Sequence, residues 1–286
     1  MALDKIHTVG IIGAGTMGQG IAQVCAASGF SVLLYDVDQG FLRKGISNID
    51  TSLQTSVNKN KLSLVQKQEA FSKIKPCESL EQVKADLIIE AAIEDLEVKK
   101  EIFKALEKSN STDCILTTNT SSIPVTQIAS SLKNSQRFAG LHFFNPAHIM
   151  KLVEVISGVA TSPATIEELK KFSEKLGKVS IPVKDSPGFV VNRVARHYYV
   201  EALKVLEENV ADIKTIDLLL RSSGFKMGAF ELMDLIGVDT NFSVTTSMYN
   251  AFHQDAKFRP SRIQQQKVEA GHHGQKSGRG FYDYSK

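Results

Sequence analysis

Residues 9–18 read Val9-Gly10-Ile11-Ile12-Gly13-Ala14-Gly15-Thr16-Met17-Gly18, an apolar run that ends in a Gly-x-Gly-x-x-Gly motif. This pattern predicts a buried parallel strand that leads directly into a helix. Gly13 permits the tight turn, Gly15 lets the backbone approach a phosphate without a Cβ in the way, and Gly18 lets the helix pack closely on the strand. Free N–H groups at the start of the helix, where Thr16 and Met17 lie, are suited to hold a pyrophosphate.

An acidic residue follows the second predicted strand at the position that such a site requires. The helix that begins near Thr16 stops at Gly29, and the β-rich segment 30–35 ends in Asp36. A carboxylate at this place binds the ribose 2′-hydroxyl of a dinucleotide and repels a 2′-phosphate. The stretch 9–36 therefore predicts a dinucleotide-binding unit that takes NAD rather than NADP.

Composition sets limits on the class of protein. The chain has 286 residues, 42% hydrophobic and 23% charged, which suits a globular protein with two domains. A net charge of +3 gives no reason to expect a nucleic-acid or anionic-membrane partner. No run approaches the roughly 20 apolar residues of a membrane span, and no targeting segment is evident at the N-terminus.

The three cysteines, Cys25, Cys77 and Cys114, are odd in number and far apart. They suggest neither a disulfide framework nor a metal site, and favour a reducing compartment. We therefore expect a cytoplasmic protein that binds no metal.

The alternation of strands and helices predicts the fold class. After two helices within residues 41–71, a second half begins with a strand over 85–91, a helix over 96–108, and strands over 114–118 and 137–142. Such an alternation is typical of a doubly wound, mostly parallel Rossmann-type sheet. Residues 151–156 follow too closely for a helical crossover, so this strand is predicted to return antiparallel. A helix from Ser162 and a strand over 178–183, at a sheet edge because of Pro182, complete the sheet.

One clear break divides the chain, at Asp185-Ser186-Pro187-Gly188. Beyond it the sequence predicts helices only, over 189–208, 212–222, 230–236, 239–257 and 260–270. We therefore expect an NAD-binding Rossmann-type domain over 1–184 and an all-helical domain over 185–286.

Two residues of the antiparallel strand pair suggest acid–base chemistry. His142 ends a parallel strand, where open α/β sheets place their sites, and Glu154 lies in an otherwise apolar strand where burial demands a partner. A symmetric turn about His148 sets these two residues opposite each other. A His–Glu pair of this kind fixes the imidazole tautomer and supports a general acid/base. His148, in the same loop, is the rival base.

Two further polar residues are candidates near the same chemistry. Ser121 follows the strand ending at Thr118, at the same edge of the sheet as His142. Asn192 shares a helix face with Tyr199, and its buried amide needs a partner. A hydrogen bond within the core and a contact with substrate explain Asn192 equally well.

Five segments together resemble the L-3-hydroxyacyl-CoA dehydrogenase family, and its short bacterial 3-hydroxybutyryl-CoA dehydrogenases in particular. These segments are Gly13–Gly18, Asn119-Thr120-Ser121-Ser122, His142-Phe143-Phe144-Asn145-Pro146, Asp185-Ser186-Pro187-Gly188-Phe189-Val190-Val191-Asn192-Arg193 and Gly278-Arg279-Gly280-Phe281-Tyr282. The resemblance extends over the whole chain. It implies an NAD-dependent enzyme that interconverts (S)-3-hydroxybutyryl-CoA and acetoacetyl-CoA, and a homodimer formed by a helical domain that also binds substrate.

The resemblance also implies a role for individual residues. His142 is the general acid/base and Glu154 its partner, while Ser121 and Asn192 bind and orient the substrate oxygen. Asp36 holds the adenosine ribose. Contacts with NAD are implied for Glu94, Lys99 and Asn119.

Two other classes of function are compatible with parts of the pattern. An NAD-dependent hydroxyacid dehydrogenase of the gulonate type uses a similar scaffold, although Phe143-Phe144 after His142 favours the acyl-CoA enzymes. A non-catalytic NAD-binding relative would keep the glycines and Asp36 without needing His142 and Glu154.

The phosphates of CoA require a basic partner. Outside the helical domain the best cluster is Lys59, Lys61 and Lys67. Lysines are also common on solvated helix faces, which is the competing interpretation. We expect Lys59 or Lys61 to contact CoA.

Overall fold

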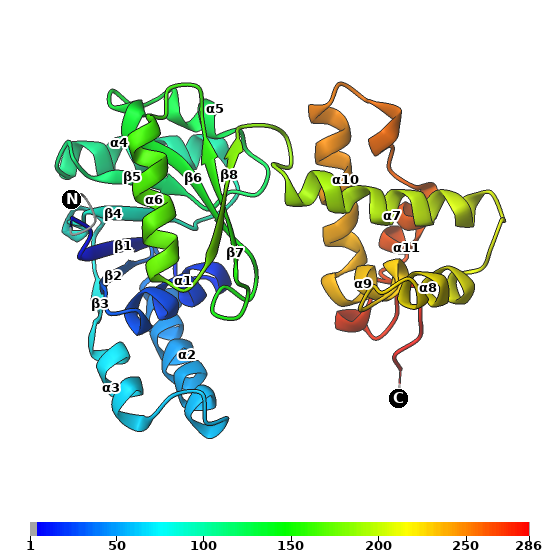
Figure 1. Cartoon of the computed structure of the whole chain (residues 1–286), viewed down its shortest axis with the longest axis horizontal. Helices are drawn as coiled ribbons and strands as arrows, with labels where there is room; N and C mark the ends of the chain where they lie inside the picture. The colour runs from blue at the N-terminus through cyan, green and yellow to red at the C-terminus, as the bar shows by residue number, and fades with distance from the viewer. Residues whose placement is uncertain (1–4, 286) are drawn as a thin grey trace. The chain divides into compact units, whose positions relative to one another are not determined.

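The computed structural model describes residues 5–285, and these form two compact units. The first unit ends at Ser186 and the second begins at Pro187. Figure 1 shows a sheet flanked by helices in the first unit and helices without a sheet in the second. Each unit has its own hydrophobic core.

The first unit contains an eight-stranded sheet with the order β3-β2-β1-β4-β5-β6-β7-β8. All neighbouring strands are parallel except β6 and β7, which are antiparallel. The predicted doubly wound, mostly parallel sheet is therefore confirmed, as are the antiparallel return and the edge position of the last strand. The strands are β1 (Thr8–Ile12), β2 (Ser31–Tyr35), β3 (Ile74–Cys77), β4 (Leu87–Glu90), β5 (Ile115–Thr118), β6 (Phe138–Phe143), β7 (Leu152–Ser157) and β8 (Val179–Lys184).

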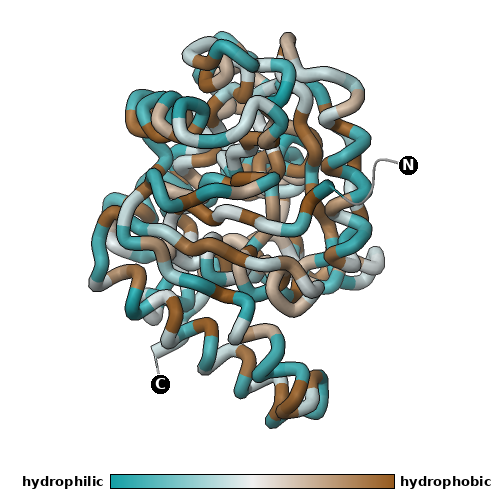
Figure 2. Tube along the Cα trace, turned by 90° about the vertical axis from the view of Figure 1, so that its left-hand side faces the viewer, coloured by the Kyte–Doolittle hydropathy of each residue, from teal (hydrophilic) through white to brown (hydrophobic). Residues whose placement is uncertain are grey.

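Helices cover both faces of this sheet (Figure 1). Helices α1 and α6 pack on one face, and α4 and α5 lie on the other, where Phe103 of α4 meets Phe138 of β6 with ring centroids 4.7 Å apart. Hydrophilic and hydrophobic residues alternate along the helices, as amphipathic helices on a sheet require (Figure 2). The helices are α1 (Thr16–Ala27), α2 (Gln39–Asn58), α3 (Leu64–Ser72), α4 (Leu96–Ser109), α5 (Val125–Ala129) and α6 (Pro163–Lys175).

The second unit is built around α7, whose residues Tyr199 and Leu203 lie in its core with Phe230 and Met233 of α9. Asp212 caps α8 by accepting a hydrogen bond from Thr215 N, as an aspartate at that position favours. The helices are α7 (Val191–Glu207), α8 (Ile213–Ser222), α9 (Ala229–Ile236), α10 (Val238–Ala251) and α11 (Arg262–Glu269).

The structure differs from the sequence analysis at one strand that was not predicted and at one helix whose predicted end was wrong. The sequence did not indicate β3, a short edge strand in which Pro76 stands, because its alternation is weak and a proline argues against a strand. The helix expected over 239–257 ends at Ala251, where His253 and Gln254 take positive φ angles of 54° and 64° and so terminate the helix.

Two fully buried carboxylates hold the C-terminal tail of the second unit. Asp234 accepts hydrogen bonds from the backbone N–H groups of Phe281 and Tyr282, both at 2.9 Å. Asp217 accepts hydrogen bonds from Phe230 N and from the Tyr282 hydroxyl. The tail over 278–284 is thus fixed by charge-assisted hydrogen bonds as well as by its aromatic side chains.

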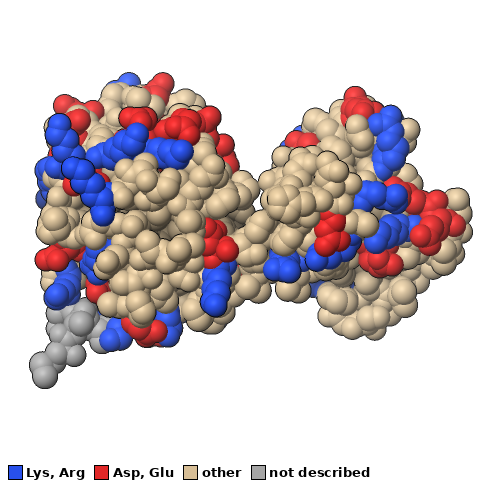
Figure 3. Space-filling view, turned by 90° about the horizontal axis from the view of Figure 1, so that it is seen from above, with Lys and Arg blue, Asp and Glu red and all other residues tan. Residues whose placement is uncertain are grey.

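Charged side chains of both signs lie on the surface. Figure 3 shows Lys and Arg interspersed with Asp and Glu on the face that it displays. Among the described residues, no helix is long and apolar enough to cross a membrane, and no group of three or more His, Cys, Asp or Glu could hold a metal ion.

Candidate active site

The glycine-rich loop after β1 has the geometry of a phosphate-binding turn. Gly13 has a φ of +102°, and a Cβ added there would lie 2.5 Å from Ala91 O. A Cβ on Gly18 would lie 1.8 Å from Gly13 O, so the start of α1 can pack only with glycine at that position. At Gly15, by contrast, a Cβ would meet nothing within 4 Å, which leaves open space next to the backbone N–H groups for a ligand phosphate.

Asp36 lies beside this loop. Its Oδ2 accepts a hydrogen bond from Ala14 N at 2.7 Å, and its Oδ1 accepts one from Asp38 N at 3.0 Å. It lines a mainly apolar cavity of about 590 Å³ together with Gly13, Gly15 and residues of β2, α2 and α4. The cavity is large enough for a ligand the size of a nucleoside, and Asp36 is the kind of residue that can accept a hydrogen bond from a hydroxyl group there.

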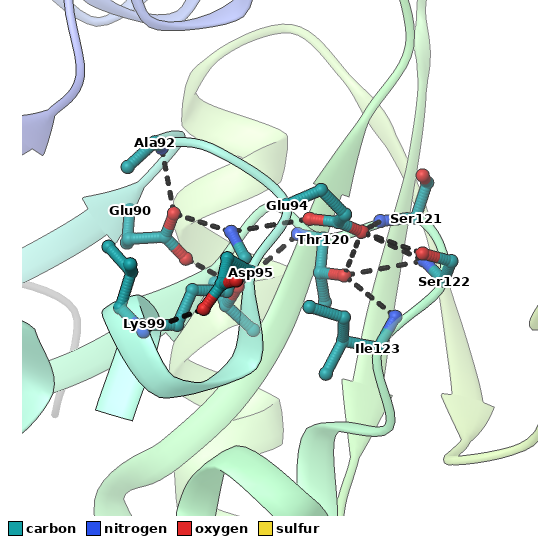
Figure 4. Close-up of polar contacts among 11 residues, drawn as sticks. Glu90, Ala92, Glu94, Asp95, Lys99, Thr120, Ser121, Ser122 and Ile123 are labelled. Carbon is teal, nitrogen blue, oxygen red and sulfur yellow. Dashed lines mark hydrogen bonds and ion pairs between the residues drawn. The ribbon is translucent and has the colours of Figure 1, made fainter. Parts of the chain in front are cut away.

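The carboxyl end of β4 carries a buried ion pair (Figure 4). Lys99 Nζ of α4 lies 2.6 Å from Glu90 Oε1, and both side chains are almost fully buried. The second oxygen of Glu90 accepts a hydrogen bond from the Thr118 hydroxyl at 2.7 Å, and Ala92 N donates to Oε1 at 2.7 Å. The pair therefore joins the ends of β4 and β5 to α4, and it also fixes the orientation of Lys99.

Lys99 reaches a second carboxylate, Glu94, with its Nζ 3.3 Å from Oε2 (Figure 4). Glu94 Oε1 accepts hydrogen bonds from the Thr120 hydroxyl and from the backbone N–H groups of Ser121 and Ser122. Burial, the largest effect, raises the pKa of Glu94, but the hydrogen bond from Thr120 and the charge of Lys99 leave this pKa below its ordinary value. Glu94 is thus held as an anion that fixes the turn containing Ser121.

The ends of β5 and β6 are joined by Asn119, whose Oδ1 accepts a hydrogen bond from Phe143 N at 2.8 Å. The residue before Phe143 is His142, which is 5% exposed. In the antiparallel register of β6 and β7, His142 pairs directly with Glu154, as predicted. His142 Nδ1 lies 2.8 Å from Glu154 Oε2, and Glu154 is fully buried.

This contact assigns the two nitrogens of the imidazole to different tasks. A carboxylate bound to Nδ1 fixes the tautomer and the orientation of the ring, so Nε2 is the nitrogen that can exchange a proton with a substrate. Because β6 is parallel to β5, β4 and β1, His142, Asn119, Glu90 and the glycine-rich loop all lie at the same edge of the sheet. That edge is where doubly wound sheets bind their ligands.

Comparison with known families covers almost all of the chain. Residues 8–186 match the family described as "3-hydroxyacyl-CoA dehydrogenase, NAD binding domain", and residues 188–284 match "3-hydroxyacyl-CoA dehydrogenase, C-terminal domain". The chain belongs to the 3-hydroxyacyl-CoA dehydrogenase family. Its first unit is the NAD-binding domain of that family, so the predicted cofactor and the predicted family are both confirmed.

Individual relatives agree with this family membership. The chain is 48% identical to a 3-hydroxyadipyl-CoA dehydrogenase of Escherichia coli, with 98% of this chain and 59% of the relative covered. It is 41% identical to a 3-hydroxybutyryl-CoA dehydrogenase of Bradyrhizobium diazoefficiens, with coverages of 98% and 96%. A crystal structure of (S)-3-hydroxybutyryl-CoA dehydrogenase from Ralstonia eutropha superposes with a TM-score of 0.94 at 41% identity, with 98% and 100% covered.

The residues predicted to bind NAD fall into two groups. The glycine-rich loop and Asp36 line a cavity and can bind a ligand directly. Lys99 is 1% exposed and paired with two carboxylates, and Asn119 binds the backbone of Phe143. A direct contact of Lys99 or Asn119 with NAD stays a prediction, whereas their role in fixing the site is visible.

The residues predicted to bind substrate differ in their location and burial. Ser121 is half-buried in the turn fixed by Glu94. Asn192 lies in the first turn of α7 in the second unit, and its side chain is half-buried rather than buried, because the apolar face of α7 begins one turn later. The two histidines of the β6–β7 hairpin differ, since His142 is buried and His148 is exposed.

The two lysines predicted for CoA contact are exposed and line a cavity of about 370 Å³. Ser52, Ser56 and His148 also line it. The third lysine of that cluster, Lys67, forms an ion pair with Asp50 at 2.8 Å, so its charge is already neutralised.

Sequence reasoning missed Glu90. A glutamate that closes the apolar run 87–90, with a lysine in the next helix, was the available signal. A buried strand rarely keeps a carboxylate unless a cation meets it.

Proposed function

We propose that this protein is an NAD-dependent dehydrogenase that interconverts short-chain (S)-3-hydroxyacyl-CoA, such as 3-hydroxybutyryl-CoA, and 3-oxoacyl-CoA, such as acetoacetyl-CoA. The observation that carries the proposal is the buried contact between His142 Nδ1 and Glu154 Oε2, at the edge of the sheet that also carries the glycine-rich loop of the NAD-binding domain. Because the chain spans 59% of the length of its E. coli relative, its activity is proposed from its own residues as well as from the family.

His142 performs the proton transfer in this proposal. Bound NAD supplies the group that accepts or donates the hydride. During oxidation His142 Nε2 takes the proton of the substrate hydroxyl, and in the reverse direction it returns the proton to the forming alkoxide. Glu154 stabilises the resulting imidazolium and does not itself take the proton.

The remaining site residues bind and orient. Ser121 and Asn192 hold the substrate oxygen, and Asp36 holds the adenosine ribose. Glu94, Lys99 and Asn119 fix the turn and strand ends that face the cofactor. Lys59 and Lys61 bind CoA phosphates, for which their cavity with Ser52 and Ser56 offers both charge and hydrogen-bond donors.

The decisive test is a spectrophotometric assay of NADH oxidation with acetoacetyl-CoA. 3-Oxoadipyl-CoA belongs in the same assay, because a relative 48% identical to this chain is named for 3-hydroxyadipyl-CoA. Turnover of acetoacetyl-CoA that His142→Gln abolishes supports the proposal. A strong preference for 3-oxoadipyl-CoA would show that the substrate carries that dicarboxylic acyl group instead. If the protein turned over no 3-oxoacyl-CoA, the proposed function would be refuted.

We further propose that the chain consists of an NAD-binding domain over 1–184 and a helical domain over 185–286, and that it forms a homodimer through the helical domain. Helices α8 and α9 expose Leu218, Leu219, Leu235 and Ile236, each by 45% or more. Apolar side chains of this size on adjacent helices are typical of an interface. Light scattering should give twice the chain mass, and Leu218→Glu with Leu219→Glu should give monomers; a monomeric wild type contradicts this proposal.

A cytoplasmic location is proposed on the three cysteines, all of which are free and buried. Thiols that are not paired in disulfides are typical of proteins in a reducing compartment. Fractionation of the source cells with antibody detection tests this, and recovery from an oxidising compartment would contradict it.

A further inference from the structure

Lys178 is a buried lysine whose charge meets no carboxylate. It lies between α6 and β8 and is 8% exposed. Its Nζ donates hydrogen bonds to Ala147 O at 2.6 Å and Met150 O at 2.8 Å. Within residues 5–285, no Asp or Glu forms an ion pair with it. An ammonium in such a place retains a strong field because water does not screen it fully.

The two carbonyls belong to the loop that joins β6 and β7, the strands that carry His142 and Glu154. Helix α1 meets the same loop, where Gly20 allows a close approach: a Cβ there would lie 3.1 Å from the Ala147 Cβ. The loop is also tied to β8, because Val179 N donates to Lys151 O at 2.8 Å. Lys178 therefore fixes the loop from one side while α1 limits its movement.

The exposed part of this loop carries His148, which lines the cavity of about 370 Å³ with Lys59 and Lys61. None of the described residues that line this cavity is acidic. Burial, the largest effect, and the charges of Lys178 and Lys61 lower the pKa of His148. The other titratable group close to Lys178 is the buried thiol of Cys25. Among the described residues that line the cavity, His148 thus meets positive charge and no acidic side chain.

We propose that His148 binds a phosphate group of CoA, and that Lys178 is the positioning residue that holds His148 at the cavity and supplies a fixed positive charge behind it. The inference rests on the acyl-CoA substrate of the proposed function. A phosphate placed between Lys59, Lys61 and His148 neutralises their mutual repulsion and accepts a hydrogen bond from the imidazole. The reacting end of the substrate makes no use of His148, which separates it from His142.

The first experiment follows the titration of His148 by NMR in the protein without NADH. Saturating CoA should raise the pKa of His148, because the phosphate charge favours the imidazolium. Lys178→Met should raise this pKa in the ligand-free protein, whereas Lys178→Arg, which keeps the charge, should leave it unchanged. If Lys178 acted through packing alone, the change in the pKa of His148 would not depend on whether the substituted residue is charged. Equal pKa values of His148 in Lys178→Met and Lys178→Arg would therefore contradict the role of the Lys178 charge.

The second experiment measures CoA binding by calorimetry. His148→Asp places a carboxylate in the cavity and should weaken CoA binding about tenfold, whereas His148→Gln should weaken it less. Because His148 is exposed, both variants should fold even if Lys178→Met does not. Lys184→Met, which removes an exposed charge from β8, is the matched control and should bind CoA as the wild type does.

The outcomes separate this inference from the proposed function. The inference alone is overturned if the wild type turns over acetoacetyl-CoA but His148→Asp leaves the affinity for CoA unchanged. It is likewise overturned if CoA leaves the pKa of His148 unchanged. A wild type that neither binds CoA nor turns over any acyl-CoA overturns both. The inference is also overturned if His148→Asp raises KM for a truncated pantetheine thioester as much as it raises KM for acyl-CoA. The truncated substrate lacks the phosphates, so its KM should not depend on a phosphate contact.

Discussion

His142 Nδ1 and Glu154 Oε2 lie 2.8 Å apart across the only antiparallel strand pair among the described strands of the sheet. The pairing register fixes this contact, since the two residues stand directly opposite each other on β6 and β7. Glu154 is fully buried, where a carboxylate needs a polar partner, and the His142 imidazole is such a partner. The two side chains therefore work as one unit.

Replacing His142 with Gln should lower kcat by at least about a hundredfold, the lower range for a positioned general acid/base. NADH binding should stay close to wild type, because His142 lies outside the glycine-rich loop. Glu154→Gln should cost no more than this, and the double variant far less than the product of the two losses. Steady-state kinetics and NADH titration test this, with the exposed His7→Gln as control. Wild-type turnover in His142→Gln together with its loss in His148→Gln would make His148 the base.

Asp36 should determine the preference for NADH over NADPH. Its carboxylate lies at the cavity beside Gly13 and Gly15, and would repel a 2′-phosphate there. Asp36→Ala should therefore raise KM for NADH and reduce the difference in kcat/KM between the two cofactors. Asp38→Ala, at the N-cap of α2 nearby, is a control for the loss of a local negative charge. Equal kcat/KM values for both cofactors in the wild type would contradict this role of Asp36.

The parts of the site that were predictable from sequence depend on short-range regularities. The glycine spacing and the strand alternation predict the cofactor loop, and a hairpin symmetric about His148 gives the His142–Glu154 register by counting. The sequence marks Glu90 as a carboxylate in a buried strand but does not identify Lys99 as its partner, and it gives no sign of the Lys178 contacts, because each joins elements whose approach depends on the packing of the whole sheet. A polar residue in an apolar run, such as Glu154, can be recognised in the sequence, but its partner can be named only where strand register fixes it.

Lys59 and Lys61 should contribute to binding of the CoA end of the substrate. Lys59→Ala or Lys61→Ala should raise KM for acyl-CoA several-fold, and by more than KM for a truncated pantetheine thioester, because phosphate contacts are charge-assisted. Lys67→Ala is the matched control, since Lys67 is already paired with Asp50. Equal effects on the two substrates would assign the lysines to a solvated helix face.

Asp234 should be important for the stability of the second unit. It accepts hydrogen bonds from Phe281 N, Tyr282 N and the Tyr284 hydroxyl, and burial with the charge of Asp234 raises the pKa of Tyr284 to about 12, which keeps this hydroxyl a donor. Asp234→Asn turns an amide NH₂ towards these donors and should lower the free energy of unfolding by about 1–3 kcal/mol. Denaturant unfolding measures this, with the exposed Asp283→Asn as control; equal stabilities would contradict the role of Asp234.

Glu94 should make the protein's stability depend on pH in the acid range. Burial acts first to raise its pKa, but the hydrogen bond from Thr120 and the charge of Lys99 hold the folded-state pKa below the ordinary value of 4.5. A carboxyl group with a lowered folded-state pKa stabilises the fold above its unfolded-state pKa, and this contribution is lost as the pH falls through the folded-state pKa.

Glu94→Gln should therefore be less stable than the wild type above about pH 4.5, and the difference should shrink as the pH falls below that value. Because the Glu94 side chain is 39% exposed, solvent screening should keep the difference to about 1 kcal/mol or less. Urea unfolding over a series of pH values measures it, with Glu97→Gln as control, since Glu97 is 73% exposed and pairs with Lys100 on the surface of α4. A difference between Glu94→Gln and wild type that stays constant at every pH would show that Glu94 contributes through shape rather than charge.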